Sequence, residues 1–295
     1  MPTSAAYLIV VLVWATTPLA IKWSAEAGAP VGSVWLRMAI AVLLGLAILY
    51  ASGRRLSLSK RALASYVAAV PGVFGAMALS YHASQTLASG LMSVMFGLAP
   101  LLSGLMLQLL PGANKLARWH WIGCVLGVVG LAVIFADSLQ VGRQQLGALA
   151  LMVVAVTLFS GSGIAVQRVA AGLHPLNQTV GALLLSMPCF AALWLASGEP
   201  LMVPLSQRGL WSVLYLGVFG SLLGFLCYYL ILSRLSAATV ALVTLITPVL
   251  ALGLGMAFNA EQPSPSMVVG ALLILTALGA YLFGDRLARL AAPPR

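Results

Sequence analysis

Charged residues are scarce in this chain of 295 residues: they make up 7% of it, and only five are acidic. A soluble globular domain has about 25% charged residues. Hydrophobic residues, by contrast, account for 62% of the chain. A soluble protein of this composition could not cover its own surface, whereas a lipid bilayer is a solvent that requires it. The composition therefore indicates a membrane protein.

Cysteine and histidine are also rare, with three of each. Cys124, Cys189 and Cys227 each lie inside an apolar run, and no two of them form a Cys-x-x-Cys pair. This pattern predicts neither a metal site nor a disulfide. We expect the thiols to behave as small buried hydrophobic groups, and we expect no cofactor.

Acidic side chains are missing from the middle of every apolar run. The five carboxylates lie near the ends of the runs or between them: Glu26, Asp137, Glu199, Glu261 and Asp285. A carboxylate inside the membrane is the usual proton relay of a pump. Among membrane transporters, the sequence therefore favours a facilitator or exchanger. Proton-coupled efflux of drugs or amphiphiles is the alternative. Catalytic side chains do not cluster at one depth, which disfavours an enzyme or a lipid-handling protein.

What the sequence does contain is a series of ten apolar runs. Each is close to the length of about 20 residues that a membrane-spanning helix needs. The breaks between them carry Gly, Pro, Asn or charged residues, which favour turns. The predicted spans are residues 4–24, 33–51, 63–83, 87–110, 119–137, 146–168, 177–197, 209–232, 238–258 and 267–284. The predicted fold class is an all-α membrane protein with ten transmembrane helices.

The basic residues orient these helices. With a cytoplasmic N-terminus, eleven Lys and Arg residues lie at the cytoplasmic side and four at the other side. This imbalance predicts that both termini are cytoplasmic. The bases form no dense patch with interleaved aromatic residues, so the net charge of +10 does not predict nucleic-acid binding.

The chain also repeats itself. The tetrapeptide Gly-Val-Phe-Gly occurs at residues 72–75 and again at 217–220, an offset of 145 residues. The same offset of 145 residues relates Trp14 to Phe159. A constant offset across separated segments indicates an internal duplication.

Two halves of five helices each follow from this duplication. We place them at residues 1–138 and 139–295. Because each half has an odd number of helices, the two halves have opposite orientations in the bilayer. Inverted repeats of this kind are typical of secondary transporters, which bind substrate near the membrane midplane at the repeat interface.

Four segments of the sequence carry a resemblance to a known family. The first helix has Trp-Ala-Thr-Thr-Pro at 14–18 followed by Lys22, and Ala/Ser-rich, proline-bearing segments occur at 88–101 and 237–249. The segment 261–274 has Glu261, Pro265 and then Gly-Ala-Leu-Leu-Ile. Together these segments resemble the EamA branch of the drug/metabolite transporter superfamily over the whole chain. The corresponding corner of the first half lacks the glutamate, a departure from the family pattern.

The resemblance implies ten helices with both termini in the cytoplasm, and export of metabolites or drugs. With uncharged polar groups inside the spans, we expect an exporter or facilitator of amino acids, aromatic ones included, or of related zwitterions. It would work by alternating access in a bacterial-type inner membrane. The expected partners are a small-molecule substrate and the lipid bilayer, and the expected state is a monomer, with a homodimer as the weaker alternative.

The candidate substrate-binding residues are polar, aromatic or methionine side chains inside the apolar runs. They are Trp14, Thr17, Arg37, Met77, Tyr81, Met95, Ser160, Ser162, Gln167, Tyr228, Thr244 and Thr247. Each has an ordinary alternative. Trp14 either lines a cavity or packs in the core, and Arg37 either contacts a substrate carboxylate or snorkels to the interface. The hydroxyl groups either line the cavity or bond to their own helix.

Prolines and glycines predict two further features. Pro18, Pro100 and Pro248 lie inside apolar runs, where they free backbone carbonyls and can act as hinges. Gly123 and Gly127 form a Gly-x-x-x-Gly pair in the fifth run, and the tenth run contains further small residues. Small residues let membrane helices approach closely, so we expect the fifth and tenth helices to pack together. For Lys22 we expect a surface pair with Glu26, four residues on.

Overall fold

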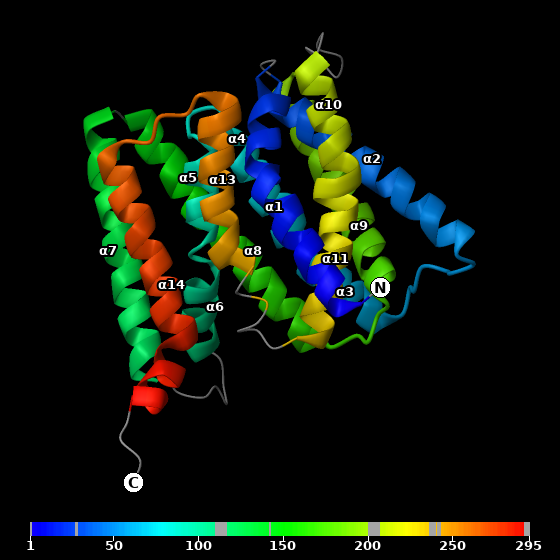
Figure 1. Ribbon diagram of the computed structural model, residues 1–295. Helices are drawn as coiled ribbons and strands as arrows, with labels where there is room; N and C mark the ends of the chain where they lie inside the picture. The colour runs from blue at the N-terminus through cyan, green and yellow to red at the C-terminus, as the bar shows by residue number, and fades with distance from the viewer. Residues whose placement is uncertain are drawn as a thin grey trace.

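The computed structural model describes residues 2–26, 29–109, 117–141, 143–199, 207–235, 240 and 243–291, without the side chains of 137–141, 244, 245 and 285–291. All regular structure in this part of the chain is helical (Figure 1). The first-half helices are α1 (Thr3–Ala25), α2 (Pro30–Ala51), α3 (Lys60–Val70), η1 (Pro71–Gly75), α4 (Ala76–Ser84), α5 (Ser89–Phe96), α6 (Ala99–Gln108) and α7 (Arg118–Val141). The second-half helices are α8 (Arg143–Val169), α9 (Pro175–Ser197), α10 (Gln207–Tyr215), η2 (Leu216–Leu223), α11 (Gly224–Arg234), α13 (Val243–Asn259) and α14 (Pro265–Ala291).

These helices account for the ten predicted spans. Within the described residues, nine helices are long and apolar enough to cross a membrane, some of them assembled from consecutive segments such as α3, η1 and α4. The ninth predicted span corresponds to α13, whose apolar stretch Ile246–Asn259 is shorter. The fourth predicted span is one run in the sequence but divides into α5 and α6. Pro100 lies in the first turn of α6, where a missing N–H is tolerated.

Local sequence signals explain several helix ends. The helices α2 and α9 begin at Pro30 and Pro175, and proline is favoured in the first turn because its φ is preset and its N–H would be unbonded there. The side chain of Ser59 accepts a hydrogen bond from the backbone N–H of Ala62 and caps α3. Gly198 ends α9 in the left-handed conformation with φ of 67°, which glycine adopts without steric cost.

The first helix of each half packs among helices of the other half. The helix α1 contacts α10, α11 and α13 of the second half, whereas α8 contacts α3, α4, α5 and α6 of the first half. Corresponding helices of the two halves also pair, because α2 packs against α9 and α5 packs against α13. This exchange brings α1 and α8 into the centre of the bundle.

The repeated tetrapeptide marks the same distortion in both halves. Residues 72–75 lie in the π-helix η1, and residues 217–220 lie in the π-helix η2. A π-helical turn inside an α-helix is rare and is frequently found at functional sites. The duplication seen in the sequence therefore corresponds to a duplicated helix distortion.

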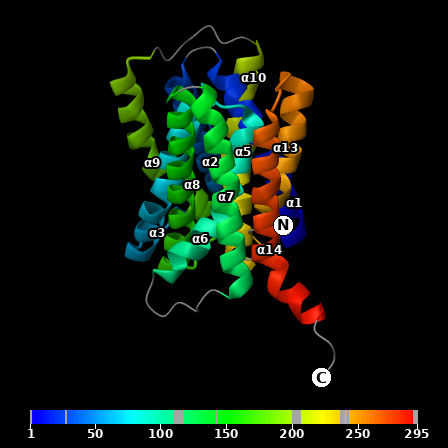
Figure 2. The ribbon, with the colours of Figure 1, turned by 90° about the vertical axis from the view of Figure 1, so that its left-hand side faces the viewer.

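The fifth and tenth predicted helices pack together, as the small residues predict. Figures 1 and 2 show α7 and α14 side by side at one edge of the bundle. A Cβ atom on Gly123 would lie 2.7 Å from the carbonyl oxygen of Ala277, and one on Gly130 would lie 2.9 Å from that of Gly270. The backbones thus approach too closely for any side chain at these glycines.

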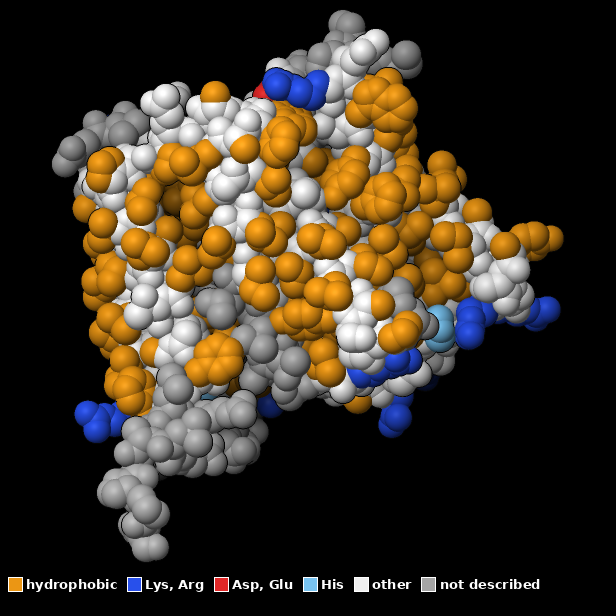
Figure 3. Space-filling view, viewed as in Figure 1, with side chains coloured by type: hydrophobic (Ala, Val, Ile, Leu, Met, Phe, Trp, Pro, Cys, Tyr) orange, Lys and Arg blue, Asp and Glu red, His pale blue; other side chains and the backbone are white. Residues whose placement is uncertain are grey.

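The charged side chains on the face shown in Figure 3 lie at the two ends of the bundle. In Figure 3, hydrophobic side chains cover its middle, and Lys and Arg side chains gather at the lower edge, the end at which both termini lie in Figure 1. At the opposite end Glu26 forms an ion pair with Arg208. The expected pairing of Lys22 with Glu26 is wrong, since Lys22 Nζ instead donates to the carbonyl oxygens of Leu87 at 3.1 Å and Ser84 at 3.5 Å.

Two carboxylates at the same end bind the N-termini of helices from the other half. Glu199 accepts hydrogen bonds from the backbone N–H groups of Val31 and Gly32, both at 2.9 Å, in the first turn of α2. Glu261 accepts from the N–H groups of Ser89 at 2.9 Å and Gly90 at 3.2 Å, in the first turn of α5. A negative charge is favourable there because the first N–H groups of a helix have no partner within it.

Candidate functional site

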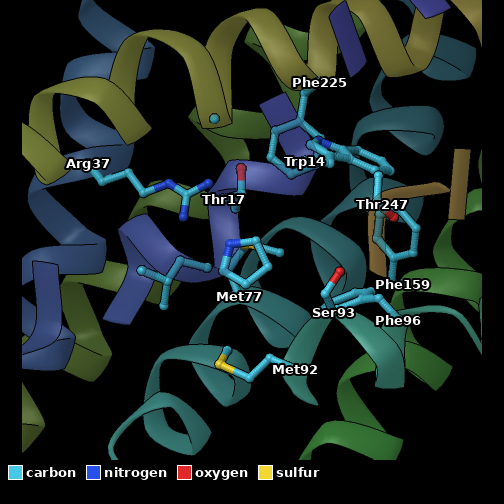
Figure 4. A pocket seen from close by; sticks show the side chains of 13 residues that line it. Trp14, Thr17, Arg37, Met77, Met92, Ser93, Phe96, Phe159, Phe225 and Thr247 are labelled. Atoms are coloured by element: carbon cyan, nitrogen blue, oxygen red, sulfur yellow. The ribbon is translucent and has the colours of Figure 1, made fainter. Parts of the chain in front are cut away.

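Two cavities lie one after the other along the centre of the bundle. The first has a volume of about 70 Å³ and contains the side chain of Arg37, so we name it the arginine cavity. Its walls come from both halves (Figure 4). The lining residues are Trp14, Thr17, Pro18, Ile21, Arg37, Met77, Met92, Ser93, Phe96, Phe159, Gly220, Phe225 and Thr247.

Arg37 is a charged side chain inside the bundle. It is 1% exposed, so it does not snorkel to the membrane interface. Its Nε donates to the hydroxyl of Ser221 at 2.7 Å, and its guanidinium lies 5.9 Å from the centre of the Tyr81 ring. The Nη1 atom has no hydrogen-bond partner, and none of the described carboxylates pairs with Arg37. A buried cation without a counter-ion is costly, and charges inside membrane spans are usually retained for function, so Arg37 is a candidate site residue.

The remaining wall of the arginine cavity is mostly apolar and includes four aromatic rings. Figure 4 shows Arg37 reaching toward Thr17 from one side, whereas Trp14, Phe225, Phe159 and Phe96 lie on the other side. Methionine side chains add flexible apolar surface between them. The cavity thus combines one cationic group with a broad apolar face.

The polar groups nearest to Arg37 are uncharged. The hydroxyl of Thr17 donates to the carbonyl of Val13 at 2.7 Å, one turn earlier in α1, which leaves its oxygen able to accept from a ligand. Pro18 has no N–H, so the carbonyl of Trp14, four residues earlier, lacks its helical partner. Hydroxyl oxygens and a freed carbonyl next to a cavity can accept hydrogen bonds from a bound ammonium group.

A second cavity of about 220 Å³ continues toward the end of the bundle that carries both termini. We name it the tyrosine cavity, because Tyr228 and Tyr281 line it together with Ser160, Gln167 and His120. No Asp or Glu lines either of these two cavities in the described part of the chain.

A third cavity of about 340 Å³ lies at the mouth of this route. Gln167 and Leu232 line both it and the tyrosine cavity, so the two adjoin. Its wall includes Gln178, whose amide is held by reciprocal hydrogen bonds with Ser65. A polar mouth therefore leads through Gln167 to the aromatic centre.

The predicted site residues divide among these places. The arginine cavity contains Trp14, Thr17, Arg37, Met77, Thr247 and the predicted hinge Pro18. The tyrosine cavity contains Trp14, Ser160, Gln167, Tyr228 and the predicted hinge Pro100.

Other predicted residues lie outside both cavities. Tyr81 is buried beneath Arg37, and Met95 is buried in the core. Ser162 donates to the carbonyl oxygens of Ala68 at 2.8 Å and Ala69 at 3.3 Å, just before η1. A further hinge candidate, Pro248, lies inside α13. The side chain of Thr244 lies outside the described residues.

Several residues of the candidate site escaped prediction. Gly220 lines the arginine cavity, and Ser221 accepts the hydrogen bond of Arg37. Both lie in η2, where the repeated tetrapeptide was a usable signal, since a π-turn often marks a functional position. Phe159 was recognisable as the repeat counterpart of Trp14. Phe96 and Phe225 had no such signal, because an apolar residue in an apolar helix carries no information about which side it faces.

The chain is similar to two proteins that are named as transporters. The chain is 25% identical over 296 residues to "Uncharacterized inner membrane transporter YedA" of Escherichia coli K12, covering 96% of this chain and 93% of that protein. It is 26% identical over 277 residues to "Uncharacterized transporter YoaV" of Bacillus subtilis strain 168, covering 90% and 91%. One solved crystal structure shares the fold, with a TM-score of 0.70, 21% identity, and coverage of 98% of this chain and 99% of that one.

The chain also matches a family of membrane transporters. The model of the EamA-like transporter family matches residues 3–136 and again residues 146–283, one copy for each half. These two copies fit the duplication at an offset of 145 residues. The chain therefore belongs to the EamA-like transporter family and is a multi-pass membrane transporter.

Proposed function

We propose that this protein exports or facilitates the passage of amino acids with apolar or aromatic side chains, or of related zwitterions, across a bacterial-type inner membrane. The two halves, related as inverted repeats, would open the arginine cavity alternately to either side. Both termini would lie in the cytoplasm, in keeping with the cationic end of the bundle in Figure 3.

The single observation that carries this proposal is the unpartnered Nη1 of Arg37 in a cavity without carboxylates. A buried donor without an acceptor leaves a desolvation cost that a ligand oxygen can remove. Guanidinium and carboxylate form short, charge-assisted hydrogen bonds, often two at once. A substrate carboxylate is thus the group best suited to complete the site.

The rest of the cavity suits the other parts of such a substrate. Aromatic rings attract a cation over their faces, so Trp14 or Phe159 can accept an ammonium group. The same rings, with Met77 and Met92, can pack against an apolar side chain. At about 70 Å³ the cavity is much smaller than the roughly 300–1,000 Å³ of typical ligand pockets. The methionine and aromatic side chains must therefore move apart to admit an amino acid.

The entry route supports transport from the end that carries the termini. From that end, the polar mouth and the tyrosine cavity lead to the aromatic rings beside Arg37. At the other end, Glu199 and Glu261 tie helix ends of the two halves together. Pro18, at the wall of the arginine cavity, is the hinge candidate placed best to let α1 bend.

Counterflow in proteoliposomes tests the substrate class. Vesicles loaded with unlabelled amino acid should take up the same labelled amino acid, fastest for leucine, methionine or phenylalanine. Leucinamide, which has no carboxylate, should not compete. Absence of exchange for every amino acid would overturn the proposal. Uptake that depends strictly on an imposed pH gradient would favour the proton-coupled alternative.

A further inference from the structure

Two residues line both the arginine cavity and the tyrosine cavity: Trp14 and Phe159. Their rings are in edge-to-face contact, with centroids 5.6 Å apart and planes at 75°. Both rings also contact Tyr228, at 5.3 Å from Trp14 and 5.4 Å from Phe159. The three rings form a closed triangle between the two cavities.

The chain leaves room for these rings. A Cβ atom at Gly163, one turn beyond Phe159 in α8, would lie 2.7 Å from the hydroxyl of Tyr228. A Cβ atom at Gly224 would lie 3.1 Å from Nε1 of Trp14. A side chain at Gly163 would therefore push against Tyr228, and one at Gly224 would press on Trp14.

The two central rings come from corresponding positions of the duplicated sequence. Trp14 is the middle residue of α1 (Thr3–Ala25), and Phe159 follows it by the repeat offset of 145 residues. Because α1 packs among helices of the second half and α8 among those of the first, a movement between the halves moves one ring relative to the other. Phe159 has no polar atom in its side chain, so their separation breaks no hydrogen bond or ion pair.

We propose that Phe159 and Trp14 together form the barrier across the transport route, with Tyr228 closing its side. While the rings touch, the arginine cavity is closed to the tyrosine cavity. When the halves move, the rings part and the two cavities become one. The proposal requires transport through this route, and it does not depend on an amino-acid substrate.

Passive leakage tests the barrier directly. Proteoliposomes carrying the double variant Trp14→Ala/Phe159→Ala are mixed rapidly with a concentrated urea solution. Their swelling as urea enters is followed by stopped-flow light scattering. Wild-type vesicles should match protein-free vesicles, whereas the double variant should admit urea several-fold faster. Each single variant should leak less, because the remaining ring still contacts Tyr228.

Matched controls separate the barrier from general damage. Phe190→Ala removes a buried ring that contacts Phe74 at 4.9 Å and lines neither cavity, so these vesicles should stay tight. If the double alanine variant does not fold, Trp14→Leu/Phe159→Leu keeps most of the apolar volume and should still leak. A folded double variant that is as tight as wild type would overturn the proposal. Since urea needs no arginine, failure of amino-acid counterflow would leave this result standing.

Discussion

The guanidinium of Arg37 donates through Nε to the hydroxyl of Ser221 at 2.7 Å, across 184 residues of sequence. Arg37 lies in the first family domain and Ser221 in the second. The contact therefore aims the charged group into the cavity from one half while the other half holds it in place. A movement between the halves would change the geometry of the cation itself.

Replacement of Arg37 by glutamine should weaken binding of carboxylate substrates about tenfold or more, since a hydrogen bond to a charged group contributes about 1.5–3 kcal/mol. Ser221→Ala should have a smaller effect on affinity, because the charge remains. The measurement is the concentration dependence of leucine counterflow. Equal affinity in wild type and Arg37→Gln would exclude Arg37 from carboxylate binding.

Loss of the carboxylate at Glu261 should destabilise the contact between α5 and the segment after α13. We expect Glu261→Ala to lower the free energy of unfolding by about 1 kcal/mol, as for other helix caps, and Glu261→Gln to lie between it and wild type. Thermal unfolding in detergent measures this order. Glu26→Ala is the control, because its exposed pair with Arg208 should contribute about 0–1 kcal/mol. A larger loss in the control than in Glu261→Ala would contradict the assignment.

A methyl group added at Gly123, in the interface of α7 and α14, should destabilise the protein, whereas one added at Gly279 should not. Gly123→Ala places Cβ 2.7 Å from a backbone carbonyl that cannot turn away, so we expect a destabilisation of about 1–3 kcal/mol. Gly279→Ala, on α14, meets nothing within 4 Å and should be neutral or slightly stabilising. Melting temperatures compare the two, and equal losses would show that the close packing is not the cause.

Acid pH should reduce the stability that His174 contributes in the loop before α9. His174 accepts the N–H of Leu176 through Nδ1 at 3.2 Å, which requires a neutral ring. Partial burial, with the neighbouring charges of Arg54 and Arg234, lowers the pKa of His174. The folded state therefore binds fewer protons than the unfolded chain below about pH 6.5, the usual histidine pKa. The contribution of His174 to stability is complete above that pH and is lost as the pH falls through its lowered value.

Measurement of the melting temperature between pH 8 and pH 5 tests this expectation. Wild type should lose stability on the acid side, and by a small amount, because only a small part of the ring is buried. His174→Asn keeps a capping side chain without a titrating group and should flatten the acid limb. If the two curves are parallel, His174 is not the titrating group.

The sequence predicted the helices well because each is a long apolar run between turn residues, and in lipid such a run has few alternatives to a helix. The run at residues 87–110 was predicted as one span, although Pro100 inside it was predicted as a hinge, and the helix divides into α5 and α6 just before that proline. The close contact of α7 and α14 followed from glycine spacing, because only glycine permits that approach.

The site was predictable where polarity is unexpected and unpredictable where it is not. Arg37, Thr17 and Gln167 are conspicuous inside apolar runs, and they line the cavities. Ser162 is equally polar, but its hydroxyl donates a hydrogen bond to a backbone carbonyl just before η1. Phe96 and Phe225 line the arginine cavity without any mark in the sequence, because tertiary packing alone decides which apolar side chains face an opening.

The two glutamate contacts also set an order for biosynthesis. Glu199 follows Val31 by 168 residues, and Glu261 follows Ser89 by 172 residues. At a synthesis rate of about 5–20 residues per second, each helix N-terminus waits about 10–30 s for its carboxylate. The first half therefore enters the membrane with two helix ends incomplete, and it reaches its final arrangement only when the ribosome has delivered the second half.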